Sequence, residues 1–533
     1  MALQLLVAAV IIIACVLFNK LSHRIGMPML LAFIALGMFF GSDGIVKIPF
    51  EDYHLAEQIC SVALIFIMFY GGFGTSWQEA KPVVPKALLL SSLGVVLTAL
   101  LTGLFCHFVL GFELLESLLI GSVLGSTDAA SVFSILRSKK LSLKYGTASL
   151  LEVESGSNDP CSYMLTAVIL SVMNGGGDAF SVVSLVFSQI VFGAAFGFLI
   201  AVASLFFLRR FRFATDGFDA AFVLAVAVLS YALPAMLGGN GYLSAYIVGI
   251  ILGNKEFRNR KALVHFFDGL TGLMQMLIFF LLGLLSFPSQ IPSILLPSLA
   301  IALFLTLIGR PLAVALILTP LRSKFSQQLV VSWAGLRGAA SIVFAIMATV
   351  DPAYMKNDIF HIAFCVVLFS IALQGSLLPL VAKKAGLIDR KGNVLKTFND
   401  YAREEDVNFV KFKITEGHPW CEKRIREISH PPETLFVLIL RDGANRIIPA
   451  GSTRVRAGDL LIMSAPAFVE GQGIALSERR IEPGDEHCGQ PLSQLPVPKD
   501  TLIILIKRGE KSIIPNGKTV IHENDVLVLN TAQ

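Results

Sequence analysis

The sequence predicts an all-α polytopic membrane protein that is followed by a small α/β module. Of its 533 residues, 55% are hydrophobic and only 15% are charged, whereas a soluble chain usually carries about 25% charged residues. The long apolar runs fill residues 1–385, and residues 386–533 have the composition of a soluble protein. We therefore expect a membrane domain at 1–385, a linker at 386–405 and two soluble modules at 406–475 and 476–533.

The apolar runs of the membrane domain divide into about thirteen predicted spans, since roughly 20 apolar residues are needed to cross a hydrocarbon core about 30 Å thick. Their ranges are 3–19, 28–42, 56–75, 87–110, 115–136, 147–173, 180–208, 217–237, 241–253, 265–286, 291–318, 326–350 and 358–382. Because the number is odd, we expect the two ends of the membrane domain on opposite sides of the bilayer.

The charges of the loops predict the orientation of the chain. Every second loop is rich in Lys and Arg, and such loops face the cytoplasm in most membrane proteins. These basic residues are Lys20, Arg24, Lys81, Lys86, Arg137, Lys139, Lys140, Lys144, Arg209, Arg210, Arg212, Lys255, Arg258, Arg260, Lys261, Arg322 and Lys324. The only Lys or Arg residues in the other loops are Lys47 and Lys356. We expect a bacterial inner-membrane protein with a periplasmic N-terminus and a cytoplasmic C-terminal part.

Several predicted spans contain charged residues, each of which costs about 2.5–3.5 kcal/mol at the middle of a bilayer. Asp128 lies in the fifth span, Glu154 and Asp159 in the sixth, Arg310 in the eleventh and Arg337 in the twelfth. Charges that persist at this depth need a partner or a function. They are therefore the first candidates for a functional site.

Asp159 is the deepest carboxylate of the sixth span and has other polar side chains close to it in the sequence. At about 100° per residue, Ser155 and Asp159 share one face of a helix, and Asn158 is adjacent. Oxygen ligands suit a hard cation such as Na⁺ or K⁺, and the same carboxylate can hold a proton instead. One carboxylate that binds either ion, but not both, is sufficient for cation/proton exchange.

Glycines weaken two spans at matching positions. Gly121 and Gly125 precede Thr127-Asp128 in the fifth span, and Gly335 and Gly338 flank Arg337 in the twelfth. The two interruptions lie seven spans apart, in corresponding positions of two six-span halves. This pattern predicts inverted six-helix repeats with an ion site near the midplane.

Other roles are open for some of these residues. Asp128 can cap the second half of a broken helix instead of binding an ion. Glu154 and Arg337 can form a buried pair that is purely structural. We interpret Arg310 as structural, whereas Asp159 is expected to be functional.

At these residues the sequence resembles the monovalent cation:proton antiporters of the sodium/proton exchanger family. The resemblance is strongest to its NhaP-like branch of potassium/proton antiporter, or cell-volume-regulation, type. The motifs that carry it are Thr127-Asp128, Glu154–Asp159, Gly335–Gly338 and Gly238–Gly253. The resemblance implies an NhaA-like antiporter fold and a homodimer of thirteen-helix protomers, each with a rigid dimerisation domain and a mobile core domain.

The resemblance also implies roles for individual residues. Asp159 would be the carboxylate shared by the cation and the proton. Thr127, Asp128 and Ser155 would complete the cation site, directly or through water, and Asn158 would stabilise it.

Two further roles follow from the same resemblance. Glu154 is expected to pair with Arg337, and the Asn158-Asp159 pair is typical of electroneutral members. The proline that often follows Thr-Asp in the family is Ala129 here.

The soluble part contains an internal repeat, typical of small β-rich units. The repeated segments are Thr434–Gly443, Ile447–Gly451 and Ala457–Leu461, and then Thr501–Gly509, Ile513–Gly517 and Glu523–Leu527. They resemble the C-terminal subdomain of potassium-transport regulatory proteins (RCK-C or TrkA-C), present twice in tandem.

A ligand of the soluble part is one of the open alternatives. No G-x-G-x-x-G motif follows a predicted strand, so no dinucleotide-binding domain is expected. We expect no cofactor, apart from a regulatory nucleotide or small anion that could bind between dimer-related copies. Arg441, Arg446 and Arg454 are its candidate contacts, and solvated surface or a dimerisation clamp without a ligand is the alternative.

Together these features predict a secondary active antiporter and not an enzyme. Its substrates would be H⁺ and a monovalent cation, with K⁺ favoured because the tail resembles potassium-transport regulators. Na⁺ or Li⁺ is the alternative, and a ligand-gated cation channel is the rival class. Membrane lipid and a second copy are the expected partners. Nucleic acid is not expected, because the basic residues are dispersed over short loops.

Overall fold

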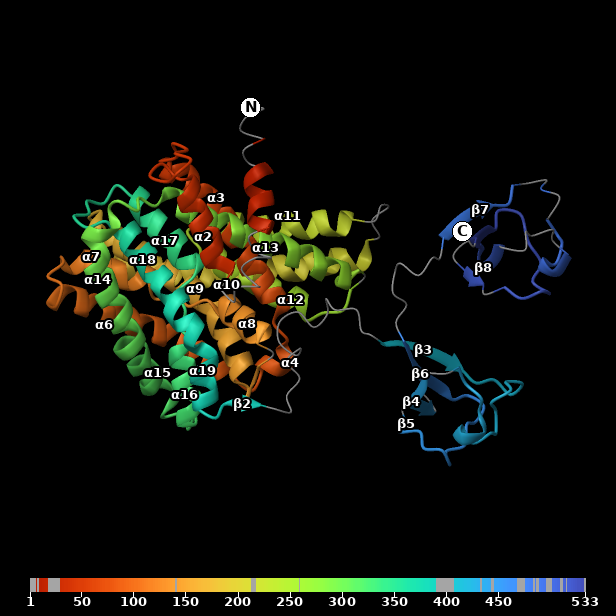
Figure 1. Cartoon of the computed structure of the whole chain (residues 1–533). Coiled ribbons are helices and arrows are strands. Elements are labelled where there is room, and N and C mark those ends of the chain that lie inside the picture. Colours follow the sequence, from red (N-terminus) through yellow and green to blue (C-terminus); the bar gives the residue numbers. More distant parts are fainter. Residues whose placement is uncertain are drawn as a thin grey trace. The chain divides into compact units, whose positions relative to one another are not determined.

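The computed structural model divides into two compact units, Met1–Arg403 and Glu404–Gln533. Figure 1 shows that the first consists mainly of helices and the second of strands. The structure describes residues 6, 9–17, 29–139, 141–211, 217–257, 259–389, 407–431, 434–441, 445–466, 475–482, 485, 488–494, 501–508, 511–513 and 515–531. Lys20, Arg24, Lys140, Arg212, Arg258, parts of the first predicted span and the linker from 390 to 405 lie outside these ranges.

Helices lie at each predicted span from 28–42 onward. They are α2 (Met29–Phe40), α3 (Tyr53–Gly74), α4 (Trp77–Ala80), α5 (Val84–Leu89), α6 (Val95–Phe108), α7 (Leu114–Val123), α8 (Ala129–Ser138), α9 (Thr147–Met173), α10 (Ala179–Arg210), α11 (Phe218–Met236), α12 (Gly241–Gly253), α13 (Arg260–Leu285), α14 (Ile291–Phe304), α15 (Arg310–Leu318), α16 (Phe325–Trp333), α17 (Ala339–Val350), α18 (Ile359–Phe369) and α19 (Ser376–Lys384). Three π-helical segments continue one helix into the next: η1 (Leu90–Gly94), η2 (Leu305–Gly309) and η3 (Ser370–Gly375).

Many of these helices are long enough to cross a bilayer. Among the described residues, seven have the length and apolar composition for it: 53–74, 84–108, 179–210, 218–236, 262–285, 291–318 and 359–384. Helix α9 is 27 residues long but carries several charged side chains. The chain is thus a helical membrane protein with polar groups concentrated in particular helices.

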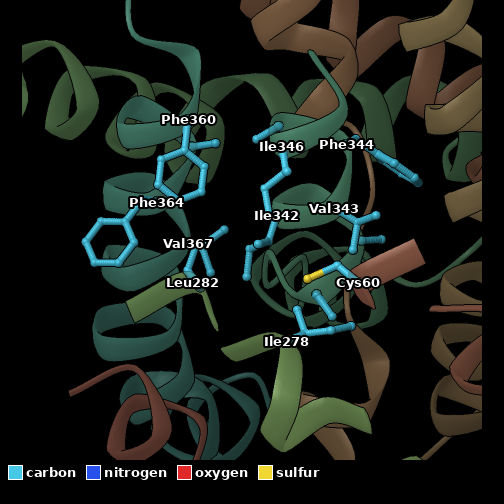
Figure 2. Close-up of a cluster of buried hydrophobic side chains, with 14 of the residues drawn as sticks. Cys60, Ile278, Leu282, Ile342, Val343, Phe344, Ile346, Phe360, Phe364 and Val367 are labelled. Atoms are coloured by element: carbon cyan, nitrogen blue, oxygen red, sulfur yellow. The ribbon is translucent and has the colours of Figure 1, made fainter. Parts of the chain in front are cut away.

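The largest apolar cluster joins α3, α13, α17 and α18. Figure 2 shows its labelled side chains, which are Cys60 of α3, Ile278 and Leu282 of α13, Ile342, Val343, Phe344 and Ile346 of α17, and Phe360, Phe364 and Val367 of α18. All of them are buried. This packing supports α17, the second half of the interrupted twelfth span.

Helices α3 and α12 approach each other closely because α12 carries glycines on the contact face. A Cβ at Gly249 would lie 2.1 Å from the carbonyl oxygen of Phe69, and one at Gly253 would lie 2.1 Å from that of Phe73. Small residues at such contacts let membrane helices pack backbone to backbone. This explains the glycines at the end of the Gly238–Gly253 motif.

The soluble unit contains two antiparallel four-stranded sheets with the same connectivity. The first module (407–466) has the order β3 (Val407–Lys413), β6 (Leu460–Pro466), β4 (Leu435–Arg441), β5 (Asn445–Ile447). The second module (475–531) has the order β7 (Ala475–Arg480), β10 (Val526–Thr531), β8 (Thr501–Arg508), β9 (Lys511–Ile513). Both have a register shift at the corresponding place, near Val437 in β4 and Ile504 in β8.

The expectation of an α/β module is wrong for the described part of this unit. Its residues form strands and two 3₁₀ turns, Ile425–Glu427 and Leu492–Gln494, with no α-helix. Glycine and proline recur in the connections between strands, and these residues favour turns over helices. The sequence therefore predicted the β-rich repeat correctly but not the helical content.

Candidate ion-binding site

The predicted interruptions of the fifth and twelfth spans are confirmed. In the fifth span, α7 ends at Val123 and α8 begins at Ala129. In the twelfth span, α16 ends at Trp333 and α17 begins at Ala339. The residues between these ends form no helix, so their backbone groups must find other partners.

The two interruptions are hydrogen-bonded to each other. The backbone N–H of Asp128 donates to the carbonyl oxygen of Leu336 over 2.7 Å. In the other direction, Nη1 of Arg337 donates to the carbonyl oxygens of Gly125 (3.0 Å) and Ser126 (2.6 Å). The unwound segments therefore satisfy each other's polar groups in a place where a bilayer supplies no water.

The second interruption also contacts the thirteenth span and closely approaches Asp128. The backbone N–H of Arg337 donates to Oγ of Ser370 over 3.0 Å, at the start of η3. A Cβ at Gly338 would lie 2.4 Å from both Cβ and Oδ2 of Asp128. Glycine is thus required at 338 for the two segments to cross at this distance.

Charges at the crossing complement the ends of the broken helices. Arg337 sits against carbonyls just beyond the C-terminus of α7, where the helix dipole is negative. Asp128 precedes α8, where the dipole is positive, and accepts hydrogen bonds from the backbone N–H of Ser131 (3.2 Å) and from its hydroxyl. The alternative role of Asp128 as a helix cap is therefore realised in the structure.

Asp159 of α9 faces this crossing. Its side chain is buried, and its carboxylate accepts a hydrogen bond from the hydroxyl of Ser126, in the first interruption. It is also close enough to Asp128 for the two carboxylates to interact electrostatically. The deepest carboxylate of the sixth span thus lies beside non-helical backbone.

Asn158 and Ser155 connect α9 to Thr127 by hydrogen bonds. The amide Nδ2 of Asn158 donates to Oγ1 of Thr127, and Oγ of Ser155 donates to its carbonyl oxygen, both over 2.6 Å. Within the described part of the chain, the buried Oδ1 of Asn158 accepts no hydrogen bond. A buried oxygen of this kind is typically satisfied by water or an ion.

The structure therefore brings together the residues proposed for the cation site, Thr127, Asp128, Ser155 and Asp159. Asn158, proposed to stabilise the site, lies beside them. Carboxylate, hydroxyl, amide and backbone oxygens of these residues lie at the contact between α9 and the first interruption. Such a set suits a hard monovalent cation, and a proton can occupy the carboxylate in its place.

The predicted pairing of Glu154 with Arg337 is wrong. Glu154 forms an ion pair with Arg310 of α15, and both side chains are almost completely buried. Arg337 is instead engaged by backbone carbonyls of the first interruption. Arg310, interpreted as structural from the sequence, is therefore the partner that neutralises Glu154.

Sequence reasoning missed the contacts of Ser126 and Arg310. Ser126 stands directly before Thr127-Asp128, in a segment already expected to be unwound, so its hydroxyl could have been considered. Arg310 follows a π-helical segment that the sequence does not reveal. Its distance from Glu154 depends on how two helices pack, which helical periodicity alone does not give.

Asn240 explains the polar start of the Gly238–Gly253 motif. Its Oδ1 accepts from the backbone N–H of Leu243 over 3.0 Å and so caps α12. Its Nδ2 donates to the carbonyl oxygen of Pro160 over 2.8 Å, next to Asp159. The motif thus ties α12 to the part of α9 that carries the candidate site.

The arginines proposed as anion contacts in the tail have other partners. Arg441 forms two 2.8 Å hydrogen bonds to the fully buried carboxylate of Asp459, which argues against a role as an anion contact. Arg454 is exposed and lies 3.5 Å from Glu422. The side chain of Arg446 lies outside the described residues.

The second module repeats the buried pair of the first. Arg508 donates to Asp525 over 2.8 and 2.7 Å, and Asp525 is fully buried. In each pair the aspartate also accepts a backbone N–H, from Arg456 (2.8 Å) or His522 (2.9 Å). The repeat seen in the sequence is therefore a repeat of sheet, bulge and ion pair.

Comparison with known proteins bears on both parts of the chain. Residues 7–384 match the family described as sodium/hydrogen exchanger, transmembrane, and residues 476–531 match the TrkA-C domain. The chain belongs to the sodium/hydrogen exchanger family. Within this exchanger, the TrkA-C match falls on the second module.

Individual relatives of this exchanger are similar over most of their length. It is 34% identical to the K(+)/H(+) antiporter NhaP of Alkalimonas amylolytica over 83% of this chain and 77% of the relative. It is also 34% identical to the K(+)/H(+) antiporter NhaP2 of Shewanella baltica over 86% of this chain and 80% of the relative. The sodium proton antiporter MjNhaP1 of Methanocaldococcus jannaschii shares the fold, with a TM-score of 0.61 and 23% identity over 70% of this chain and all of that one.

Proposed function

We propose that this exchanger is a secondary active antiporter that exchanges a monovalent cation, K⁺ in the first place, for H⁺ by alternating access. The observation that carries the proposal is that Asp159 is buried beside the crossing of the two interrupted helices and accepts a hydrogen bond from Ser126 there. A cation and a proton compete for this one carboxylate. Asp159 gives up its proton when the cation binds and takes a proton when the cation leaves.

The other residues of the site have supporting roles in this proposal. Thr127, Asp128 and Ser155 contribute oxygen ligands, directly or through water, and Asn158 positions Thr127. Arg337 offsets the negative helix end at the crossing. Because one carboxylate exchanges one cation for one proton, we propose that transport is electroneutral.

Two observations favour K⁺ as the cation. Relatives that are 34% identical are K(+)/H(+) antiporters, and the tail matches a TrkA-C domain. Na⁺ or Li⁺ is the alternative, supported by the shared fold of a sodium proton antiporter. The oxygen ligands at the site suit any of these hard ions.

We further propose thirteen spans arranged as inverted six-helix repeats. The support is a pattern that occurs once in each half. A helix with a π-helical segment comes directly before the interrupted helix, with η1 before the fifth span and η2 before the twelfth. A mobile core around the crossing would then move against a scaffold, in a homodimer surrounded by lipid.

The expected setting is the bacterial inner membrane, with a periplasmic N-terminus and the soluble unit in the cytoplasm. The support is the concentration of Lys and Arg in alternate loops.

The tail would regulate transport in pH and volume homeostasis. We propose that its first module is a second TrkA-C-like copy, because it shares the sheet order and the buried pair of the second. For the tail as a whole, the proposed ligand is a nucleotide or a small anion.

The test is cation-induced proton efflux in everted vesicles with Na⁺, Li⁺, K⁺ and Rb⁺ across a range of pH. We expect exchange by the wild type, loss of exchange in Asp159→Asn, and wild-type exchange in the control Glu51→Gln, an exposed loop residue. Wild-type exchange in Asp159→Asn would show that the site is elsewhere. A uniform cation leak without proton exchange would indicate a channel instead.

A further inference from the structure

A two-stranded sheet joins the loop between α8 and α9 to the end of the membrane domain. Strand β1 (Ser142–Leu143) pairs antiparallel with β2 (Ile388–Asp389), with Ser142 opposite Asp389 and Leu143 opposite Ile388. The next residue extends the pairing, because the backbone N–H of Lys144 donates to the carbonyl oxygen of Leu387 over 2.9 Å. We call these two strands, with Lys144 and Leu387, the clip.

The path of the chain into the clip is fixed by its turn and by burial. Gly386 adopts a left-handed conformation (φ 67°) just after α19, and its carbonyl oxygen accepts from Nζ of Lys144 over 3.2 Å. The side chain of Leu387 is fully buried and that of Leu143 nearly so. In Figure 1, β2 lies at the end of α19.

The clip is part of the same apolar cluster as the helices of the candidate site. Leu143 and Leu387 pack in a cluster with buried residues of α8, α9, α16 and α19. Helix α8 follows the interruption that holds Asp128, and α9 carries Asp159. A displacement of the clip would therefore be transmitted by direct packing to the two helices that form the site.

The clip also has a special position in the sequence. On one side, β1 lies between the end of α8 at Ser138 and the start of α9 at Thr147. On the other side, β2 is the last described element before the soluble unit, which begins at Glu404. The last described strand before the tail is thus paired with the loop that joins the two site helices.

We infer that the clip is the element through which the soluble tail regulates the transport site. A two-stranded sheet of this length is only marginally stable by itself, so its docking depends on burial of Leu143 and Leu387. A rearrangement of the tail that pulls on β2 can shift this docking equilibrium. Release of the clip frees the α8–α9 loop, and docking restrains it.

The inference rests on the proposed antiport function for its transport readout, but its structural part can be measured separately. The first readout is hydrogen exchange of the backbone amides of residues 142–144 in the full-length protein. The tail is perturbed with Asp459→Asn, which removes the charge from the buried pair with Arg441. Glu422→Gln, which removes the exposed pair with Arg454, is the matched control.

We expect Asp459→Asn to change the exchange rate of the clip amides about fivefold or more, the lower end of the usual range for coupling between sites, and Glu422→Gln to leave it unchanged. If Asp459→Asn leaves the clip amides unchanged while it loosens the first module, the tail does not act on the clip and the inference is wrong. This readout does not require transport, so it stands even if no cation is exchanged.

The second readout is the KM for the cation, measured in everted vesicles for a set of variants. Lys144→Pro removes the backbone donor of the clip, and Lys144→Ala keeps that donor and removes only the side-chain contact with Gly386. We expect Asp459→Asn to shift the KM for the cation in wild type and in Lys144→Ala, but not in Lys144→Pro. An equal shift in all three backgrounds, or no shift in any, would exclude the clip as the route.

A disulfide across the two strands, called the lock, gives a test that does not depend on correct folding of the proline variant. Ser142→Cys with Asp389→Cys places two thiols directly opposite each other, and oxidation holds the clip closed. We expect oxidation to remove the effect of Asp459→Asn and reduction to restore it, with the single-cysteine variants as controls. An effect that persists in the oxidised lock would contradict the inference.

Discussion

The backbone N–H of Asp128 donates a 2.7 Å hydrogen bond to the carbonyl oxygen of Leu336. This bond joins the interruption of the fifth span to that of the twelfth. Arg337 strengthens the crossing from the other side through two backbone carbonyls. The candidate ion site is therefore built on the contact between two unwound segments, and the geometry of that contact can be tested by substitution.

The first prediction concerns the close approach of Gly338 to Asp128. In Gly338→Ala, the new Cβ would lie 2.4 Å from Oδ2 of Asp128, and the two segments would have to move apart. We expect the exchange rate to fall roughly tenfold or more, because overpacking of this kind costs about 1–3 kcal/mol. Cation-induced proton efflux, corrected for the amount of protein in the membrane, measures the loss.

Gly272→Ala is the matched control for this variant. Apart from the nearby backbone of its own helix, no atom lies within 4 Å of the Cβ position at Gly272, which is on the exposed side of α13. We expect wild-type exchange from it. Full activity in Gly338→Ala would mean that the crossing tolerates displacement and does not define the site.

The second prediction concerns the hydroxyl of Ser126 on Asp159. A donor to this carboxylate stabilises its charged forms, with or without a cation, more than its protonated form. Ser126→Ala should therefore favour the proton in the competition and raise the KM for the cation about tenfold at fixed pH, near the lower limit for a hydrogen bond to a charged group. Ser126→Thr retains a hydroxyl and should stay close to wild type. An unchanged KM in the alanine variant would show that this bond has no role in transport.

Much of this site could be predicted from the sequence because its signals are local. Glycines next to Thr127-Asp128 and around Arg337 indicated where two helices break, and these breaks are present. The spacing of Ser155 and Asp159 on one helix face pointed to Asp159, which lies beside the first interruption. Such features depend on residues within one or two turns of the same helix.

Contacts between helices could not be predicted in the same way. Among the described residues two arginines are buried, Arg310 and Arg337, and by charge either can neutralise Glu154. The choice depends on the rotation of α15 relative to α9, and a π-helical segment, η2, lies immediately before Arg310. A π-helical segment changes the rotation of the residues that follow it, so the ideal helical angle does not apply there.

The third prediction uses this pair to test the packing of α9 against α15. Glu154→Gln and Arg310→Met should each destabilise the protein by about 3–5 kcal/mol, because each leaves a buried charge without its partner. The double variant should cost clearly less than the sum. Thermal unfolding of the purified protein in detergent gives the three values.

A second cycle with Arg337 distinguishes the structure from the sequence-based expectation. Arg337→Met leaves the Glu154–Arg310 pair intact, so its coupling energy with Glu154→Gln should be smaller than that between Glu154→Gln and Arg310→Met. A stronger coupling of Glu154 to Arg337 than to Arg310 would instead support the Glu154–Arg337 pairing that was expected from the sequence.

The last prediction concerns the pH dependence of the tail. Burial alone would raise the pKa of Asp459, but hydrogen bonds from Arg441 and from the backbone N–H of Arg456 outweigh it and lower the pKa. The hydrogen bond from Arg508 is the main cause of the lowered pKa of Asp525. Both carboxyls therefore bind protons more weakly in the folded tail than in the unfolded chain.

Carboxyls with a lowered pKa stabilise the fold above their unfolded pKa of about 3.9 and lose this contribution as the pH falls toward their folded values. We expect the stability of the first module to be constant above about pH 5 and to fall below about pH 4. Asp459→Asn should lower the plateau by about 3 kcal/mol and weaken the acid dependence. Fluorescence of Trp420, which packs against the core of this module, reports unfolding in a Trp77→Phe/Trp333→Phe background. Glu422→Gln, which removes only an exposed pair, should keep the wild-type curve, and an acid profile that Asp459→Asn leaves unchanged would assign it to other carboxyls.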